Sequence, residues 1–304
     1  MKKTYYSNGK LLLTGEYVVL DGAKALALPT KYGQRLNILP GKDKIIHWTS
    51  YDVDNSIWFQ DQITFSEISN NAKKQHYNSI KNTLIDILYH AYLQQPDFIT
   101  KNEGYIVTTE LTFPRLWGLG TSSTLLANIA QWLSIDPFIL LRSSFGGSGY
   151  DVACATNNTP IIYQLENNHP IIHTATFHPE YHDHLYFLYL NQKQSSKDAI
   201  VTYYNKNNHL VKIIAEISKI TDNVLQARDL KDFVYEMEKH EVIMSDVLET
   251  LTVKEALFDD FKGMIKSLGA WGGDFVLVIS KENPKTYFKD RGFETLLRYN
   301  EMIL

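Results

Sequence analysis

The feature that most constrains the fold is a run of glycine and hydroxyl residues that leads straight into a helix. Residues Pro114–Thr124 read PRLWGLGTSST, and apolar residues at helical spacing follow from Leu125 to Leu133. Glycine lets a backbone approach a ligand closely, and the first N–H groups of a helix have no intrahelical acceptor. The segment therefore predicts either an anion site suited to nucleotide phosphates or an ordinary turn with a hydroxyl cap. It is neither a Walker motif nor a Rossmann fingerprint.

Two further glycine-rich loops and one lysine carry candidate functional groups. Phe145–Asp151 reads FGGSGYD, and a carboxylate after such a turn either serves as a general base or simply caps the turn. Gly269–Asp274 reads GAWGGD, and it either closes over phosphates or follows the end of a helix as a tight turn. Lys10, in the run Gly9–Tyr17, is either a solvated side chain or a lysine that faces a site. Each segment alone leaves both interpretations open.

Hydrophobic periodicity predicts a chain of mixed strands and helices. At roughly 150 residues per domain, 304 residues suffice for two domains or for one two-lobed unit. Early strands followed by later helices indicate an α+β fold with a boundary near residue 180. The expected strands are Lys10–Leu13, Ala25–Leu28 ending at Pro29, Gln34–Leu39 ending at Pro40, Ile45–Trp48, Ile57–Phe59, Tyr105–Leu111, Leu185–Leu190 and Phe275–Ile279. The expected helices are one that carries Ile80–Ala91 and is stopped by Pro96, one that begins directly after Ser123 and carries Leu125–Leu133, and three near residues 208–226, 230–248 and 254–268.

Composition argues against several classes of protein. The 30 Lys and Arg residues against 34 Asp and Glu residues leave a net charge of −4, without the basic excess typical of nucleic-acid binding. Charged residues make up 21% and aromatic residues 12% of the chain, so we expect it to fold. The lone Cys154 cannot form an intramolecular disulfide or a cysteine zinc cluster, and its context predicts a packing position. No apolar run approaches the ~18 residues of a membrane span, and we expect a cytoplasmic protein without a nucleic-acid or membrane partner.

Taken together and in this order, the four segments resemble the GHMP kinase superfamily, and most closely its mevalonate kinase and phosphomevalonate kinase branch. Gly9–Pro29, which begins GKLLLTGEYVVLDG, resembles the N-terminal motif of the superfamily. Pro114–Ser123 is similar to its P-x-x-x-G-L-G-x-S-S phosphate loop, and Leu268–Asp274 is similar to its C-terminal glycine motif. Gly147–Ala153 reads GSGYDVA and is similar to the GSGFDVA stretch of phosphomevalonate kinases. The resemblance extends over most of the chain.

The resemblance implies a GHMP kinase fold with two α+β lobes. The N-terminal lobe, like domain 2 of ribosomal protein S5, would cover residues 1–180, and a ferredoxin-like C-terminal lobe would cover residues 181–304. The implied activity uses ATP and Mg²⁺ and transfers the γ-phosphoryl group to a small hydroxylated or phosphorylated metabolite, either mevalonate or phosphomevalonate. Such chemistry depends mainly on positioning and electrostatic stabilisation.

The resemblance also implies roles for individual residues. Asp151 would take the proton of the acceptor or orient its oxygen, and Lys10 would neutralise charge on the transferring phosphoryl group. Ser122 would reach Mg²⁺ as well as phosphate. The implied ATP-binding residues are Trp117, Gly118, Leu119, Gly120, Thr121, Ser122, Ser123, Gly272 and Gly273, and the implied acceptor-binding residues are Glu16, Ser148, Lys193, Ser195 and Ser196.

Three features depart from the mevalonate kinase pattern. The stretch Phe138–Arg142 has no acidic residue where those kinases carry a magnesium-binding glutamate, so Ser122, phosphates and water would hold the metal. The span from Gly120 to Asp151 is short, which suggests a lost helix. Trp117 and Trp271 stand where smaller residues are common, and they either stack on adenine or fill space. Three interpretations therefore stay open: an active kinase, a small-molecule sensor without turnover, and a member of the decarboxylase branch.

Overall fold

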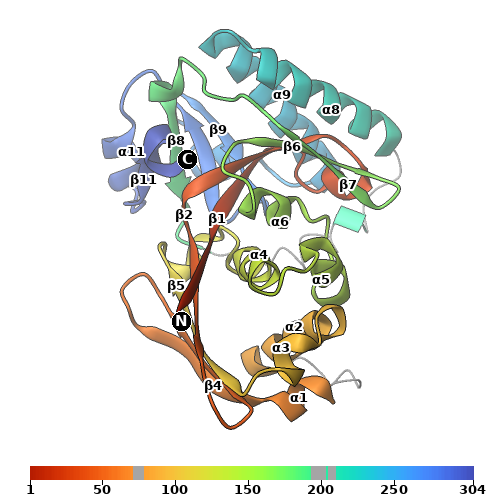
Figure 1. The fold of residues 1–304 in the computed structure, drawn as a ribbon. Helices are drawn as coiled ribbons and strands as arrows, with labels where there is room; N and C mark the ends of the chain where they lie inside the picture. The colour runs from red at the N-terminus through yellow and green to blue at the C-terminus, as the bar shows by residue number, and fades with distance from the viewer. Residues whose placement is uncertain (71–78, 193–202, 205–209) are drawn as a thin grey trace. The chain divides into compact units, whose positions relative to one another are not determined.

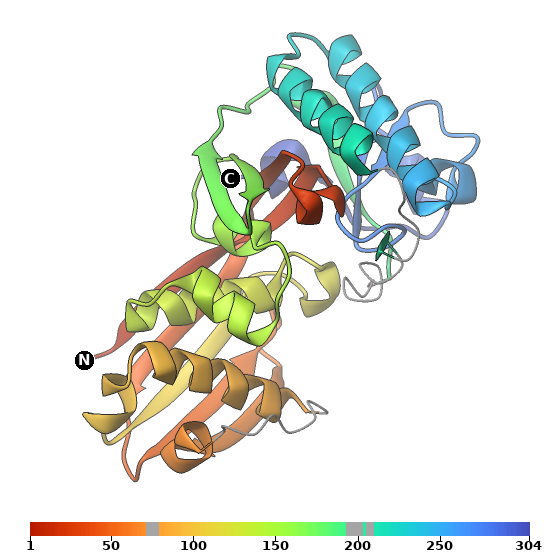
Figure 2. The ribbon, with the colours of Figure 1, turned by 90° about the vertical axis from the view of Figure 1, so that its right-hand side faces the viewer.

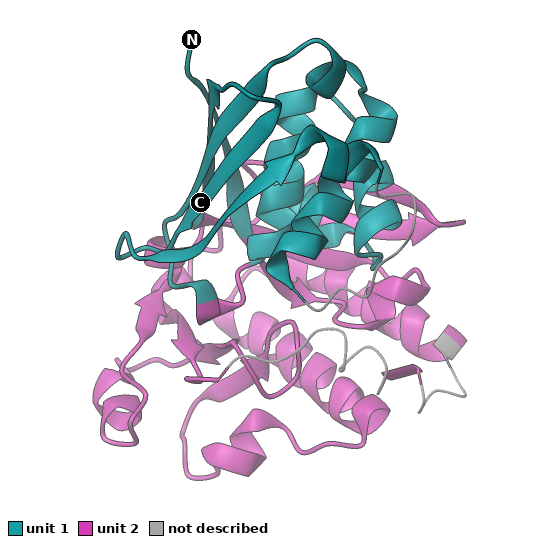
Figure 3. Ribbon diagram, turned by 90° about the horizontal axis from the view of Figure 1, so that it is seen from below, with its two compact units in different colours: residues 1–9, 32–115, 120–156 teal, residues 10–31, 116–119, 157–304 magenta. Residues whose placement is uncertain are grey.

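The computed structural model describes residues 1–70, 79–192, 203–204 and 210–304. The chain divides into two compact units, each built from separate stretches of sequence (Figure 3). Unit 1 contains residues 1–9, 32–115 and 120–156, and unit 2 contains residues 10–31, 116–119 and 157–304. The division into lobes 1–180 and 181–304 that the sequence led us to expect stays a prediction beside these units.

Unit 1 is built on a mixed sheet with the strand order β4-β3-β5-β2 (Figure 1). The pair β3–β4 is antiparallel, β3–β5 is parallel, and the C-terminal part of β2 pairs with β5 in antiparallel register from Gln34 opposite Leu111 to Pro40 opposite Tyr105. The strand β1 also pairs with β2. The bounds of these strands are Lys3–Thr14 for β1, Ala25–Pro40 for β2, Ile45–Tyr51 for β3, Ile57–Thr64 for β4 and Gly104–Leu111 for β5.

Helices cover one face of this sheet (Figure 2). Trp48 and Val107 on the strands, Leu88 on α2 and Ile129 on α4 belong to one buried apolar cluster. Burial of such apolar surface is the main stabilising contribution to folding. The helices are α1 (Phe65–Ser69), α2 (Ile80–Gln94), α3 (Asp97–Thr100), α4 (Thr121–Leu133), α5 (Pro137–Ser144) and α6 (Tyr150–Ala155), and the short 3₁₀ helix η2 covers Arg115–Trp117.

Unit 2 contains two groups of antiparallel strands and a long pair of helices. The N-terminal part of β2 pairs with β6, which pairs with β7, and a separate sheet has the order β11-β8-β10-β9. Helices α8 and α9 lie side by side (Figures 1 and 2). The bounds are η1 Val18–Asp21, β6 Ile161–Glu166, β7 His169–Thr174, η3 His182–His184, β8 Leu185–Tyr189, α8 Leu210–Gln226, α9 Leu230–Leu248, α10 Val253–Leu257, β9 Met264–Ser267, β10 Phe275–Ile279, α11 Lys285–Lys289, β11 Leu296–Arg298 and α12 Tyr299–Met302.

The structure confirms most of the expected elements and corrects two. The predicted stop at Pro29 is wrong, because β2 runs without a break from Ala25 to Pro40. Pro29 lies between the stretch that pairs with β6 and the stretch that pairs with β5, so those ladders lose no N–H donor there. The predicted helix 254–268 is also wrong, because its apolar residues divide between the short helix α10 and the buried strand β9.

Two further findings concern the whole described chain. Cys154 on α6 is fully buried and takes part in no disulfide among the described residues, in keeping with the packing position that its context predicted. Among the described residues, no helix combines the length and the apolar character that crossing a membrane requires.

Candidate functional site

In unit 1, Asp151 is held in one orientation by Ser123. Asp151 is the second residue of α6, which begins after Gly149 at a φ of 91°. Its Oδ2 accepts a hydrogen bond of 2.5 Å from the Ser123 hydroxyl, and its Oδ1 accepts one of 2.9 Å from the N–H of Val152. Ser123 is only 5% exposed, whereas Asp151 is partly exposed. A buried hydroxyl thus fixes a carboxylate that keeps access to solvent.

The helix that carries Ser123 begins without a side-chain cap. Gly120 is the residue before α4, it has a φ of 94°, and as a glycine it gives the first turn no side-chain cap. The first N–H to bond within the helix is that of Thr124, which donates to the carbonyl of Gly120 at 2.9 Å. The N–H groups of Thr121, Ser122 and Ser123 therefore lie at the positive end of the helix dipole without an intrahelical acceptor. Such an arrangement can bind an anion.

In unit 2, Lys10 lies against the first half of the predicted phosphate loop. Its Nζ donates to the carbonyl of Gly118 at 3.1 Å, and its backbone N–H donates to the carbonyl of Leu119 at 3.0 Å. A Cβ on Gly118 would come within 2.1 Å of Oδ2 of Asp274, so only glycine leaves room there for that carboxylate. Unit 2 therefore brings together Lys10, Gly118 and the end of the third glycine loop.

The two tryptophans of these loops have different partners within unit 2, aromatic rings for Trp117 and a carbonyl group for Trp271. The Trp117 ring meets Phe275 edge-on, with centroids 5.4 Å apart, and lies 6.3 Å from the ring of Tyr189. The indole N–H of Trp271 donates to the carbonyl of Leu251 at 3.1 Å. The Trp117 ring thus takes part in packing and the Trp271 indole in a hydrogen bond, and the predicted contact of Trp117 with ATP stays a prediction.

The third glycine loop is held from both sides. Gly269 and Gly272 have φ values of 70° and 77°. The N–H of Trp271 donates to the hydroxyl oxygen of Tyr17 at 2.7 Å. At the other end, the side chain of Gln192 donates to the carbonyl of Gly272, and the N–H of Asp274 donates to the carbonyl of Gln192.

Glu16 lies in a buried cluster of charged groups. Its Oε1 accepts a hydrogen bond of 2.6 Å from Nζ of Lys266, and its Oε2 lies 3.1 Å from Nε2 of His240. Nε2 of His240 also accepts the N–H of Gly15 at 3.0 Å. Burial raises the pKa of Glu16, against the opposing effect of Lys266, and burial holds the pKa of His240 well below its usual range. The predicted acceptor contact of Glu16 stays a prediction, and the described partners of its carboxyl group are protein groups.

The other residues predicted to bind the acceptor are Ser148, Lys193, Ser195 and Ser196. Ser148 is partly exposed in the turn before α6 in unit 1. Lys193, Ser195 and Ser196 lie outside the described residues.

No pattern in the sequence singled out Tyr17, Lys266, His240 or Glu241 as functional candidates. Lys266 stands in the mostly apolar stretch Met264–Leu268. A single lysine in such a stretch indicates a buried side chain that needs an oppositely charged partner. Glu241 follows His240 on α9, and its Oε1 accepts the hydroxyl of Ser267 at 2.9 Å. Burial raises the pKa of Glu241 to about 7.

The donor atoms fit Mg²⁺ only if phosphate and water complete its shell. Over the described part of the chain, no three His, Cys, Asp or Glu side chains gather in a way that could hold a metal ion. Ser122 is exposed on the first turn of α4, where its hydroxyl is a hard oxygen donor. Mg²⁺ is usually held by one or two protein oxygens together with substrate phosphates and waters. Ser122 therefore fits as a single protein ligand.

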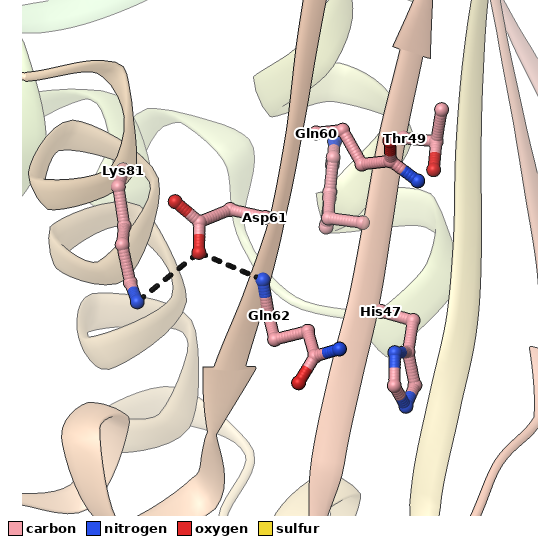
Figure 4. Close-up of a pocket in the computed structure, with 7 residues that line it drawn as sticks. His47, Thr49, Gln60, Asp61, Gln62 and Lys81 are labelled. Carbon is pink, nitrogen blue, oxygen red and sulfur yellow. Dashed lines mark hydrogen bonds and ion pairs between the residues drawn. The ribbon is translucent and has the colours of Figure 1, made fainter.

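A polar hollow of about 480 Å³ lies on the edge of the sheet in unit 1 (Figure 4). Its lysine, Lys81, forms ion pairs of 3.2 Å with both Asp61 and Glu67. His47 and Gln62 stand opposite each other on β3 and β4. The hollow contains none of the residues that the motifs single out, and its charged lining groups are paired with one another.

The comparisons with known proteins identify the fold. No protein-family model and no curated protein matches the sequence. Among solved structures, the Methanococcus jannaschii mevalonate kinase is 15% identical, with a TM-score of 0.69 over 97% of this chain and 96% of that one. A Streptococcus pneumoniae phosphomevalonate kinase in complex with phosphomevalonate and AMPPNP is 16% identical, with a TM-score of 0.71 over 97% of this chain and 99% of that one. A Lactococcus lactis galactokinase complexed with galactose is 11% identical, with a TM-score of 0.66 over 95% and 88% of the two chains.

The chain therefore has the α+β fold of the GHMP kinases, as its motifs led us to expect. The solved structures with this fold include kinases for different acceptors, so the fold by itself leaves the acceptor open.

Proposed function

We propose that this protein is an ATP-dependent kinase that transfers the γ-phosphoryl group to a small hydroxylated or phosphorylated metabolite. The observation that carries the proposal is the 2.5 Å hydrogen bond from Ser123 to Asp151, made from the first turn of an uncapped helix. The first turn of α4 thereby orients the carboxylate of Asp151 on α6 and also presents N–H donors without an intrahelical acceptor to an anion. Phosphoryl transfer needs both groups, because it depends on orienting the acceptor and stabilising phosphate charge.

Asp151 accepts the proton of the acceptor or orients its oxygen, and Ser123 keeps the carboxylate in place. The N–H groups at the start of α4 bind phosphate oxygens, and the glycines before and within this loop allow the close approach. Lys10 neutralises charge on the transferring group. Ser122 would hold Mg²⁺ together with phosphate and water, and the metal when bound would further neutralise phosphate charge. The backbone of the third loop, with Gly272 and Gly273, completes the contacts with ATP.

We further propose that the acceptor is mevalonate or phosphomevalonate. The support is the GSGYDVA stretch around Asp151 and the structural likeness to kinases of both acceptors. The proposed acceptor-binding residues are Glu16, Ser148, Lys193, Ser195 and Ser196. A sugar kinase is the competing assignment, since a galactokinase has the same fold.

ADP formation over a panel of acceptors tests this proposal. The purified protein is incubated with ATP, Mg²⁺ and one of mevalonate, phosphomevalonate, homoserine or galactose, and the Asp151→Asn variant serves as the control for contaminating activity. We expect ADP well above that control with mevalonate or phosphomevalonate. ATP binding without ADP formation from any acceptor would instead support the sensor, and release of CO₂ would support the decarboxylase branch. Turnover with galactose alone would refute the proposed acceptor but not the kinase.

A further inference from the structure

The turn after β1 has a backbone conformation that side chains rarely adopt. Tyr17 has φ 61° and ψ −54°, and the N–H of Val18 donates to the carbonyl of Glu16 at 2.7 Å. These values define the rare form of the γ-turn, which is strained for a residue with a side chain. Such a conformation persists only where the surrounding structure fixes it.

Buried polar contacts fix the residues on the N-terminal side of Tyr17. Glu16 is 2% exposed, and its partner Lys266 is fully buried. Lys266 also donates to the carbonyl of Ser267 at 2.8 Å, and His240 accepts the N–H of Gly15. Separating a buried ion pair leaves uncompensated charge in the protein interior. A relaxation of the turn that moved Glu16 away from Lys266 would therefore be costly.

This γ-turn orients the Tyr17 side chain toward the third glycine loop, Gly269–Asp274. Its hydroxyl oxygen accepts the N–H of Trp271 at 2.7 Å, and its ring stacks on Tyr203 with centroids 5.7 Å apart. Burial raises the pKa of Tyr17 to about 12, so the hydroxyl stays neutral at ordinary pH. A neutral, buried hydroxyl on a fixed turn is a rigid acceptor.

The glycine loop is held at its first residue, where the backbone N–H of Gly269 bonds to the buried carboxylate of Glu16, but the loop leaves space around its glycines. A Cβ added at Gly269 or Gly272 would meet no atom within 4 Å, so no neighbour packs against that side of either glycine. Glycine is also the residue that loses most conformational freedom when it is ordered. The contacts of Gln192 hold the end of the loop, whereas the bond from Trp271 to Tyr17 lies at its centre.

We propose that Tyr17 is a positioning residue that holds the loop Gly269–Gly273 in the conformation that binds nucleotide. The inference rests on the proposed function for its nucleotide part. The ion pair of Glu16 and Lys266 holds the strained turn, and the turn orients the Tyr17 hydroxyl toward the loop. The hydroxyl then orders the loop before ATP binds. Ordering a loop in advance improves affinity because the bound state no longer has to provide that entropy.

Tyr17→Phe tests the inference, because phenylalanine keeps the ring and removes only the acceptor for Trp271. The matched control is Tyr299→Phe, which removes another buried hydroxyl of unit 2, one that donates to the carbonyl of Phe177 at 3.1 Å. The amide hydrogen exchange of Trp271 and the Kd for Mg·ATP are measured for both variants. We expect roughly tenfold faster exchange at Trp271 and several-fold weaker nucleotide binding in Tyr17→Phe only, with thermal stability close to that of wild type.

Each outcome decides a separate point. Unchanged exchange at Trp271 in Tyr17→Phe would overturn the inference, whatever happens to ATP binding. Faster exchange with wild-type affinity for Mg·ATP would show that Tyr17 orders the loop without serving the nucleotide, which also overturns it. A wild-type protein that binds no ATP would refute the proposed function and the nucleotide part of the inference, and Trp271 exchange would still decide whether Tyr17 holds the loop.

Discussion

The buried carboxyl group of Glu241 predicts an unusual dependence of stability on pH. Burial raises the pKa of this group from 4.5 to about 7, although Lys266 and hydrogen bonds from Ser267 oppose the shift. The folded protein therefore favours the protonated form more than the unfolded chain does. The stability that protonated Glu241 adds to the folded protein is fully present below pH 4.5 and is lost as the pH rises through 7.

The magnitude follows from the two pKa values. Each tenfold change in proton affinity corresponds to about 1.4 kcal/mol, so ionising Glu241 in the folded state costs about 3 kcal/mol above pH 7. Glu241→Gln removes this cost, and its amide oxygen can still accept the hydroxyl of Ser267. Lys266 keeps Glu16 as an ion-pair partner in that variant. We therefore expect Glu241→Gln to gain stability relative to wild type as the pH rises.

Urea unfolding between pH 5 and pH 8 measures the effect. We expect the difference in unfolding free energy between Glu241→Gln and wild type to grow by about 2–3 kcal/mol over this range. The matched control is Glu238→Gln, an exposed position on the same helix, where the difference stays flat. Parallel curves for Glu241→Gln and wild type would refute the reasoning, because they would mean that Glu241 titrates alike in the folded and unfolded states.

Two further predictions concern the loop at the start of α4. Ser123→Ala removes the hydroxyl that holds Asp151, and a hydrogen bond to a charged group is worth about 1.5–3 kcal/mol, so kcat should fall by about 10- to 100-fold at nearly unchanged ATP affinity. The control Ser144→Ala, which loses only a bond to a helix carbonyl, should retain wild-type kcat, and full activity in Ser123→Ala would contradict the assigned role. Gly120→Val should weaken ATP binding severely, because a side chain blocks backbone approach at a φ of 94°. In calorimetry, the control Gly292→Val carries the same backbone strain in open space and should bind ATP normally, whereas normal binding by folded Gly120→Val would refute the loop assignment.

Periodicity in the sequence predicts the long elements of the fold well. The apolar spacing from Ile80 to Ala91 lies within α2, and the β-branched run Tyr105–Leu111 forms most of β5. The error at 254–268 has a physical cause, because a four-residue strand such as β9 is too short to show a period. Proline is a weak stop where no ladder bond is needed, which explains the unbroken β2.

The candidate site is predictable in its motifs but not in its contacts. Glycine spacing identifies the loops, and a carboxylate after a glycine turn identifies Asp151. The sequence does not predict that Ser123 turns inward to bond Asp151 while Ser122 faces solvent, because that choice depends on the rotation of α4 about its axis. Nor does it predict that Lys266 reaches Glu16, which is 250 residues distant in the chain. Such long-range pairs depend on the complete fold.

The turnover of Asp151→Asn tests the kinase assignment most directly. The substitution keeps the size of the side chain and an oxygen for the Ser123 hydroxyl but removes the charge that accepts a proton. With the acceptor found in the panel, we predict that kcat falls at least ~100-fold while the Kd for Mg·ATP stays close to that of wild type. Wild-type kcat in a folded Asp151→Asn protein would contradict the account, since Asp151 would then have no role in phosphoryl transfer.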